Sequence, residues 1–151
     1  ETLPGVSRCD FDALEQTIRE LTEEGNIVIA GIQHYERYSR VPHPQQVIDF
    51  HRRSEAGAIV VSGSQAHYAQ AIQPFTDRII HYGLGNLFFD QMDNPIKGTT
   101  QELLDRHVFY DGKLLQTELI TAKLTDYSRP QIMTNDERIR FLTEIFAVQV
   151  N

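Results

Sequence analysis

Three short apolar runs, each ended abruptly by glycine or polar residues, constrain the fold of this chain most strongly. The runs cover residues 27–32, 58–61 and 79–82. Runs of this length that are rich in Ile and Val and bounded by turn residues are typical of strands buried on both faces of a sheet. Because ligands of open α/β sheets bind outside the carboxyl ends of the strands, the polar residues that follow these runs are the first candidates for a site.

Two helical patterns alternate with the predicted strands. Asp10 is a good N-cap for a helix that runs to about Glu24, and Pro44 suits the first turn of a second helix that runs to about Glu55. The second helix separates the first two strands and completes a β-α-β unit with a right-handed crossover. We also expect a short helical turn within residues 66–74 and a brief helix at residues 100–105.

The last third of the chain changes character. Residues 107–123 predict a β-hairpin, because Asp111-Gly112 is a dipeptide that a type I′ turn favours. Thr134 and Glu137 have the spacing of a capping box that opens a final helix. The sequence therefore predicts an α/β fold: a mostly parallel sheet flanked by helices, followed by a β-hairpin and a C-terminal helix.

The composition is that of an ordinary globular chain, and it excludes several classes of function. A chain of 151 residues is long enough for one domain. Its formal net charge of -7, with scattered basic residues, argues against binding to nucleic acid. The single cysteine, Cys9, excludes an internal disulfide and a Cys-x-x-Cys metal site. No apolar run approaches the ~20 residues that a membrane span needs.

His67 is the strongest single candidate for chemistry. It follows the second predicted strand in the stretch Gly63-Ser64-Gln65-Ala66-His67, where the glycine lets the backbone turn tightly. A histidine in such a place is either a metal ligand or general acid–base group, or a loop residue that caps a nearby carbonyl.

Two further polar clusters follow the first and third predicted strands. His34 and Glu36 are two residues apart, so the carboxylate can orient the imidazole or accept a proton from water; the alternative is a solvated loop. The glycines of residues 83–86 permit close approach of the backbone to a ligand, and Asn86 anchors either this loop or a substrate oxygen. His81 falls within the third strand and is expected to be a hydrogen-bonded core residue.

Together these three polar segments resemble the poly-γ-glutamate capsule-biosynthesis proteins, the CapA-like family. The segments read Q-H-Y-E-R-Y at residues 33–38, G-S-Q-A-H at residues 63–67 and Y-G-L-G-N-L-F at residues 82–88. The family's usual pattern in these places is His-Trp-Gly-x-Glu, Gly-His-x-Pro-His and Ser-Leu-Gly-Asn-Phe, and the order and gaps agree over about residues 10–92. The family looks related to calcineurin-like metallophosphoesterases, which implies a divalent-metal site for Mn, Zn or Mg.

The resemblance also implies roles for individual positions. Glu36 and His67 match the family's glutamate and its final histidine, whereas Gln33 and Gln65 stand at or beside histidine positions. Amides are poorer ligands for a catalytic metal than imidazole, so the chain resembles a glutamine-bearing branch in which the metal is either retained or lost. The resemblance implies catalytic roles for His34, Glu36 and His67, substrate binding by Gln33, Ser64 and Asn86, and metal binding by His67, Gln65 and Gln33.

Two motifs that open CapA-like domains, a Gly-Asp strand motif and an Asn-His-x-x-Asp-type motif, do not occur in this sequence. We therefore expect either a single domain over residues 1–151 or the C-terminal half of a CapA-like domain. In both cases the motifs lie in residues 10–92, and the hairpin and terminal helix lie in residues 107–148. In the second case another segment supplies the missing N-terminal half.

The leading hypothesis is a CapA-like, metallophosphatase-type protein of the cell envelope or its extracellular side. It would carry out metal-assisted hydrolysis or transfer on a phosphorylated, small-molecule or polyanionic envelope substrate. The alternative is a non-catalytic module that binds a glycan or polyanion through amides and aromatic rings such as Gln33, Gln65 and Tyr38. A third interpretation is a scaffold whose motif residues only hold loops together.

Overall fold

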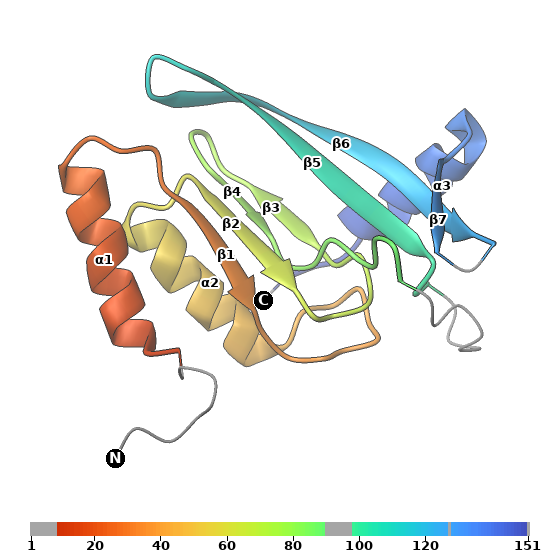
Figure 1. The fold of residues 1–151 in the computed structure, drawn as a ribbon, viewed down its shortest axis with the longest axis horizontal. Helices are drawn as coiled ribbons and strands as arrows, with labels where there is room; N and C mark the ends of the chain where they lie inside the picture. The colour runs from red at the N-terminus through yellow and green to blue at the C-terminus, as the bar shows by residue number, and fades with distance from the viewer. Residues whose placement is uncertain (1–8, 90–97, 127, 151) are drawn as a thin grey trace.

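The computed structural model describes residues 9–89, 98–126 and 128–150, and these residues form two sheets and three helices (Figure 1). The predicted α/β class is confirmed. In chain order the elements are α1 (Phe11–Glu23), β1 (Ile29–Gln33), α2 (Pro44–Ala56), β2 (Val60–Ser64), β3 (Ile72–Pro74), β4 (Ile79–His81), β5 (Gln101–Tyr110), β6 (Lys113–Thr125), β7 (Arg129–Ile132) and α3 (Asn135–Phe146).

The first sheet contains the three strands that the apolar runs predict. Its order is β1-β2-β4-β3, in which β1, β2 and β4 run parallel and the short β3 pairs antiparallel with β4. Gly31, Ser62 and His81 occupy one row of the register. The three parallel strands therefore end at the same edge, and the loops that follow them begin side by side.

Helices α1 and α2 cover one face of this sheet (Figure 1). The core on that face includes Ile18 of α1, Phe50 of α2 and, from the sheet, Val61 and Ile80. All four residues are at most 2% exposed. Burial of aliphatic and aromatic side chains of this size stabilises a fold by about 1.5–3 kcal/mol each, so this core is a main support of the first sheet.

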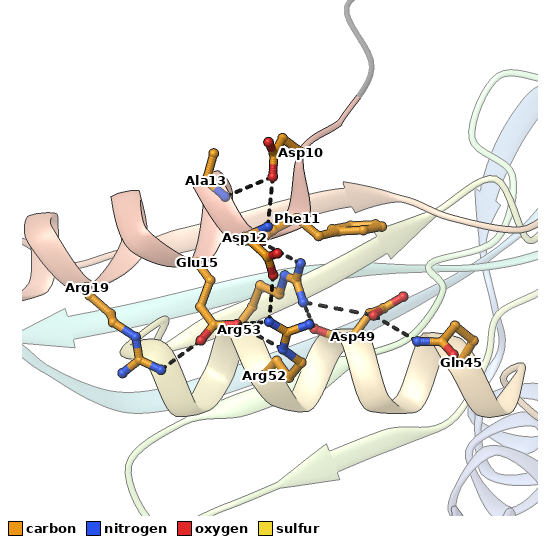
Figure 2. Close-up of polar contacts among 10 residues, drawn as sticks. All are labelled: Asp10, Phe11, Asp12, Ala13, Glu15, Arg19, Gln45, Asp49, Arg52 and Arg53. Carbon is orange, nitrogen blue, oxygen red and sulfur yellow. Dashed lines mark hydrogen bonds and ion pairs between the residues drawn. The ribbon is translucent and has the colours of Figure 1, made fainter.

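Two arginines of α2 hold α1 in place (Figure 2). The Arg52 guanidinium lies 2.9 Å from an Asp12 carboxylate oxygen and 2.8 Å from one of Glu15. Arg53 is fully buried, donates to the Phe11 carbonyl at 2.9 Å and lies 4.4 Å from the centre of the Phe11 ring. The polar groups of α2 thus bind the N-terminal turns of α1.

The opposite face of the first sheet is covered by the second sheet and α3. Val60 and Ile79 share a core with Leu103 of β5 and with Phe141 and Ile145 of α3. The second sheet is antiparallel, with the order β5-β6-β7. Beyond the core, β5 and β6 continue as a long hairpin across the molecule (Figure 1).

The local signals for the ends of elements are confirmed. The Asp10 carboxylate accepts two hydrogen bonds from backbone N–H groups in the first turn of α1. Thr134 and Glu137 form the reciprocal capping box of α3. Asp111 (φ 48°) and Gly112 (φ 72°) both have the left-handed conformation that a type I′ turn requires.

Two local expectations are wrong. The helix expected at residues 100–105 is instead the start of β5, whose Leu103 N–H donates to the Leu84 carbonyl at 2.8 Å. The helical turn expected within residues 66–74 is a bent loop that ends in β3. In both places pairing with a neighbouring strand outweighs a weak local helix propensity.

Glu102 is an unusual buried acid in β5. Its side chain is 1% exposed, and neither carboxylate oxygen has a hydrogen-bond partner among the described residues. Burial raises the pKa of the Glu102 carboxyl from 4.5 to about 7. Between these two values the folded chain keeps a proton that the unfolded chain has released, so stability falls as the pH rises through this window.

We predict that Glu102→Gln removes this loss of stability. From pH 4.5 to pH 7, the wild type should lose up to about 3 kcal/mol of unfolding free energy relative to the variant. This follows because one pKa unit corresponds to about 1.4 kcal/mol. Urea denaturation at a series of pH values measures it. Glu23→Gln, at an exposed position of α1, controls for the loss of a carboxylate. A constant difference across the pH range would contradict the prediction.

Candidate functional site

Two buried glutamines hold together the loops at the carboxyl edge of the first sheet. The Gln46 side chain, in the first turn of α2, donates to the Tyr82 carbonyl at 2.7 Å and to the Gln70 side-chain oxygen at 3.2 Å. Gln70 in turn donates to the Ser39 carbonyl at 3.0 Å. The loops that follow β1, β2 and β4 are therefore fixed relative to one another.

The close approach of β2 to the Tyr82 carbonyl requires a glycine, and the residues after β2 adopt strained backbone angles. A Cβ atom on Gly63 would lie 1.9 Å from the Tyr82 carbonyl oxygen, a distance that real Cβ atoms do not show. After β2, Gln65 (φ 78°) and His67 (φ 57°) both adopt the left-handed conformation. Such angles are uncommon outside glycine, and they persist where the surrounding structure imposes them, often at functional sites.

A chain of hydrogen bonds fixes the orientation of the His67 ring. The Asn86 amide nitrogen donates to the Thr99 carbonyl at 2.9 Å, so the Asn86 oxygen faces Nδ1 of His67, 2.8 Å away. Because an amide oxygen only accepts hydrogen bonds, Nδ1 must carry the proton. In the neutral ring the lone pair is then on Nε2, to which none of the described residues hydrogen-bonds. His67 is thereby prepared to accept a proton or to bind a metal ion through Nε2.

Tyr38 brings Glu36 to His67. The rings of Tyr38 and His67 are stacked, with 5.6 Å between their centres and 13° between their planes. The Tyr38 hydroxyl donates to a Glu36 carboxylate oxygen at 2.5 Å. This hydrogen bond to the carboxylate raises the pKa of the Tyr38 hydroxyl. Tyr38 thus contacts a half-buried imidazole through its ring face and an exposed acid through its hydroxyl group.

The two glutamines that replace histidines in the motifs bind each other. Gln33, at the end of β1, donates from its amide to the Gln65 side-chain oxygen at 2.6 Å. Ser64 is paired with Gln33 in the sheet register and is exposed at the end of β2. The structure therefore brings Gln33, Ser64 and Gln65 together at this edge.

His34 binds Asp49 of α2 and lines an open cavity together with Gln33. Its Nε2 lies 2.9 Å from an Asp49 carboxylate oxygen of α2, and the two side chains are 4% and 7% exposed. The other Asp49 oxygen accepts a hydrogen bond from the Gln45 amide at 3.1 Å and lies 4.0 Å from the buried Arg53 guanidinium. His34 thus contacts a buried network that anchors α2, whereas Glu36 and His67 contact Tyr38.

The donors at this edge do not make a metal centre by themselves. Within the described part of the chain, no group of three or more His, Cys, Asp or Glu side chains could hold a metal ion. The Gln65 oxygen already accepts a hydrogen bond from Gln33, and an amide is a poor ligand for a catalytic metal. Nε2 of His67 and the Glu36 carboxylate remain as donors, so a divalent ion here needs ligands in addition to those described.

The part of the chain that carries this site matches a known protein family. A family model described as "Bacterial capsule synthesis protein PGA_cap" matches residues 1–91, more than half of the chain. The chain belongs to this capsule-synthesis family. The "PGA biosynthesis protein CapA" of Bacillus subtilis (strain 168) is 30% identical over 88 residues, which cover 58% of this chain and 23% of that protein. The "Capsule biosynthesis protein CapA" of Bacillus anthracis is 30% identical over 92 residues, which cover 58% of this chain and 22% of that protein.

The chain therefore spans less than a quarter of the length of these curated relatives. Membership of the capsule-synthesis family associates the chain with capsule synthesis. No helix in the described ranges is long and apolar enough to cross a membrane. Because the match ends at residue 91, β5, β6, β7 and α3 lie outside the part that the capsule-synthesis family model covers.

The sequence gives little indication that several of the residues at this edge contribute to it. Gln46, Gln70 and Asp49 bind partners that lie 15 to 36 positions away along the chain, and no local pattern predicts such contacts. A partial signal exists for Asp49, because it shares one face of α2 with residues four positions before and after it. That spacing predicts a network on α2 without predicting that His34 joins it.

We predict that the buried pair supports stability and the exposed acid does not. Asp49→Asn should lower the free energy of unfolding by about 2–4 kcal/mol, because it leaves the buried Arg53 guanidinium and the His34 ring without their carboxylate. Glu36→Gln, at an exposed position, should change it by less than about 0.5 kcal/mol. Urea denaturation midpoints measure both variants. Equal losses of unfolding free energy in Asp49→Asn and Glu36→Gln would contradict the prediction.

Proposed function

We propose that this chain contributes a catalytic edge to a metallophosphatase-type, CapA-like protein that hydrolyses or transfers groups on a phosphorylated or polyanionic envelope substrate. The observation that carries the proposal is the His67 ring, whose Nδ1–H is bound by Asn86 and whose Nε2 is free of hydrogen bonds from the described residues. A fixed tautomer with one free nitrogen is the arrangement that a general base needs.

In this proposal His67 accepts a proton at Nε2 from the attacking water or hydroxyl group. Glu36 holds the Tyr38 hydroxyl, and the Tyr38 ring keeps the imidazole in its plane. Gln33, Ser64 and Gln65 present amide and hydroxyl groups that suit the oxygen atoms of a substrate. In the alternative in which Nε2 of His67 binds a divalent ion such as Mn, Zn or Mg in place of the proton, ligands from outside the described residues would complete the site, and the ion would polarise a substrate oxygen.

A second candidate function is binding without catalysis, on the extracellular side of the envelope. It is supported by the pairing of Gln33 with Gln65, which places two amides where a metallophosphatase-type site has imidazoles. Amides and the neighbouring tyrosine rings bind sugars or polyanions without a metal. This function does not need a free Nε2 on His67.

We predict that His67→Ala lowers phosphoester hydrolysis by about 10²–10⁴-fold, because it removes the proton acceptor. Asn86→Ala should lower it by about 10–100-fold, since the ring loses its orientation. Rates on p-nitrophenyl phosphate and bis(p-nitrophenyl) phosphate, together with elemental analysis for metal, measure both effects. His51→Gln is the matched control, because His51 hydrogen-bonds Gln73, away from His67.

Unchanged hydrolysis and unchanged metal content in His67→Ala would contradict the catalytic proposal. Binding of an acidic or neutral polysaccharide that persists in EDTA, and that is weakened by Gln65→Ala but not by His67→Ala, would then favour the binding function. The same set of variants therefore distinguishes catalysis from binding without catalysis.

A further inference from the structure

Arg40 is a partly buried cation that neutral groups hold in a fixed position. Its side chain is 15% exposed. The guanidinium donates to the Ala69 carbonyl at 3.3 Å and to the side-chain oxygen of Gln101. Its central carbon lies 5.8 Å from the Tyr68 ring centre and 5.0 Å from that of Phe141. Two aromatic faces and two oxygens thus orient the guanidinium without neutralising it.

One exposed acid supplies the negative charge. A single oxygen of Glu144, on α3, accepts from Nε of Arg40 at 3.1 Å and from Nη2 at 2.7 Å. The Glu144 side chain is 58% exposed, and it is the one carboxylate that pairs with Arg40 within the described residues. The pair does not use the parallel two-oxygen geometry in which carboxylates bind arginine best. Ion pairs with so exposed a partner contribute little net free energy, so Glu144 can be displaced.

The pair lies at the edge of an open pocket, two of whose lining residues are chain neighbours of residues at the His67 site. The pocket has a volume of about 490 Å³ and is lined by Arg40, Tyr68, Gly98, Thr100, Gln101 and Glu144. Tyr68 follows His67 in the chain. Thr100 follows Thr99, whose carbonyl holds Asn86. The same loops therefore carry the pocket and the groups that orient the His67 ring.

We propose that this pocket is a carboxylate-binding subsite, and that Glu144 occupies it as an internal substitute when no ligand is bound. A ligand carboxylate displaces the Glu144 side chain and binds the Arg40 guanidinium through both oxygens, while Ala69, Gln101 and the two rings keep the guanidinium in place. The identification of this ligand as the substrate of the His67 site rests on the function proposed above. The existence of the carboxylate subsite does not rest on that function.

The negative net charge of the chain explains why an acidic ligand would need a fixed local cation. A chain with a formal net charge of -7 repels an acidic ligand at long range, so recognition needs a local cation of fixed geometry. An internal carboxylate also avoids leaving that cation partly buried and unpaired in the free chain. Because Glu144 and Phe141 belong to α3 and Gln101 begins β5, the C-terminal third of the chain takes part in binding beside the loops of the first sheet.

The test compares Glu144→Gln with wild type, using glutarate as the probe and isothermal titration calorimetry as the measurement. Glu144→Gln should bind glutarate about fivefold more tightly, because the internal competitor is lost. Arg40→Gln should abolish binding. Glu15→Gln is the matched control: it removes the carboxylate of another arginine–glutamate pair between elements, with Arg52, and should leave glutarate affinity unchanged.

Unchanged or weaker glutarate binding by Glu144→Gln would overturn the proposal, and so would an equal gain in Glu15→Gln. A second variant, Arg40→Lys, keeps the charge but loses the two-oxygen geometry, and should bind glutarate more weakly than wild type if Arg40→Gln fails to fold. Titration with inorganic phosphate separates carboxylate recognition from general anion binding: equal gains for phosphate and glutarate would contradict a carboxylate subsite. His67→Ala should bind glutarate like wild type. Failure of the catalytic proposal can therefore be distinguished from failure of the carboxylate subsite.

Discussion

The parallel register of β1, β2 and β4 is the constraint on which the rest of the site depends. It ends three strands at one edge, and Gly63 lets the end of β2 pass close to the Tyr82 carbonyl. That close approach allows two buried amides, Gln46 and Gln70, to connect all three loops. The positions of Glu36, His67 and Asn86 follow from this framework, since each lies in one of the connected loops.

Buried and exposed polar groups have different tasks in this fold. Burial of a polar group is costly without a hydrogen-bond partner, and His34 with Asp49 and His81 with Asp105 form hydrogen-bonded pairs inside the structure. The expectation that His81 is a hydrogen-bonded core residue is confirmed, because it is fully buried with Nδ1 2.7 Å from Asp105. The groups that remain available for chemistry lie at the carboxyl edge, where His67 is half-buried.

The sequence predicts those features that depend on neighbours along the chain. The Asp10 cap, the Thr134 capping box and the Asp111-Gly112 turn all involve contacts within a few residues, and all are confirmed. The convergence of Glu36 and His67 at one edge was also predictable, because parallel strands end together. The partner of His34 and the start of β5 depend on tertiary pairing. The Arg40–Glu144 contact joins residues 104 positions apart, beyond the reach of any local pattern.

The central claim is that Asn86 holds the neutral form of the His67 ring as the Nδ1–H tautomer, with no described residue hydrogen-bonded to Nε2. Two-bond ¹H–¹⁵N correlation spectra of the histidine rings test it directly at about pH 8.5, two units above the ordinary histidine pKa of about 6.5. His67→Gln assigns the signals. We expect Nδ1 to resonate as the protonated nitrogen and Nε2 as the bare one, and Asn86→Ala to abolish that preference. A proton on Nε2 in the wild-type chain, or an even mixture of tautomers, would contradict the role given to His67.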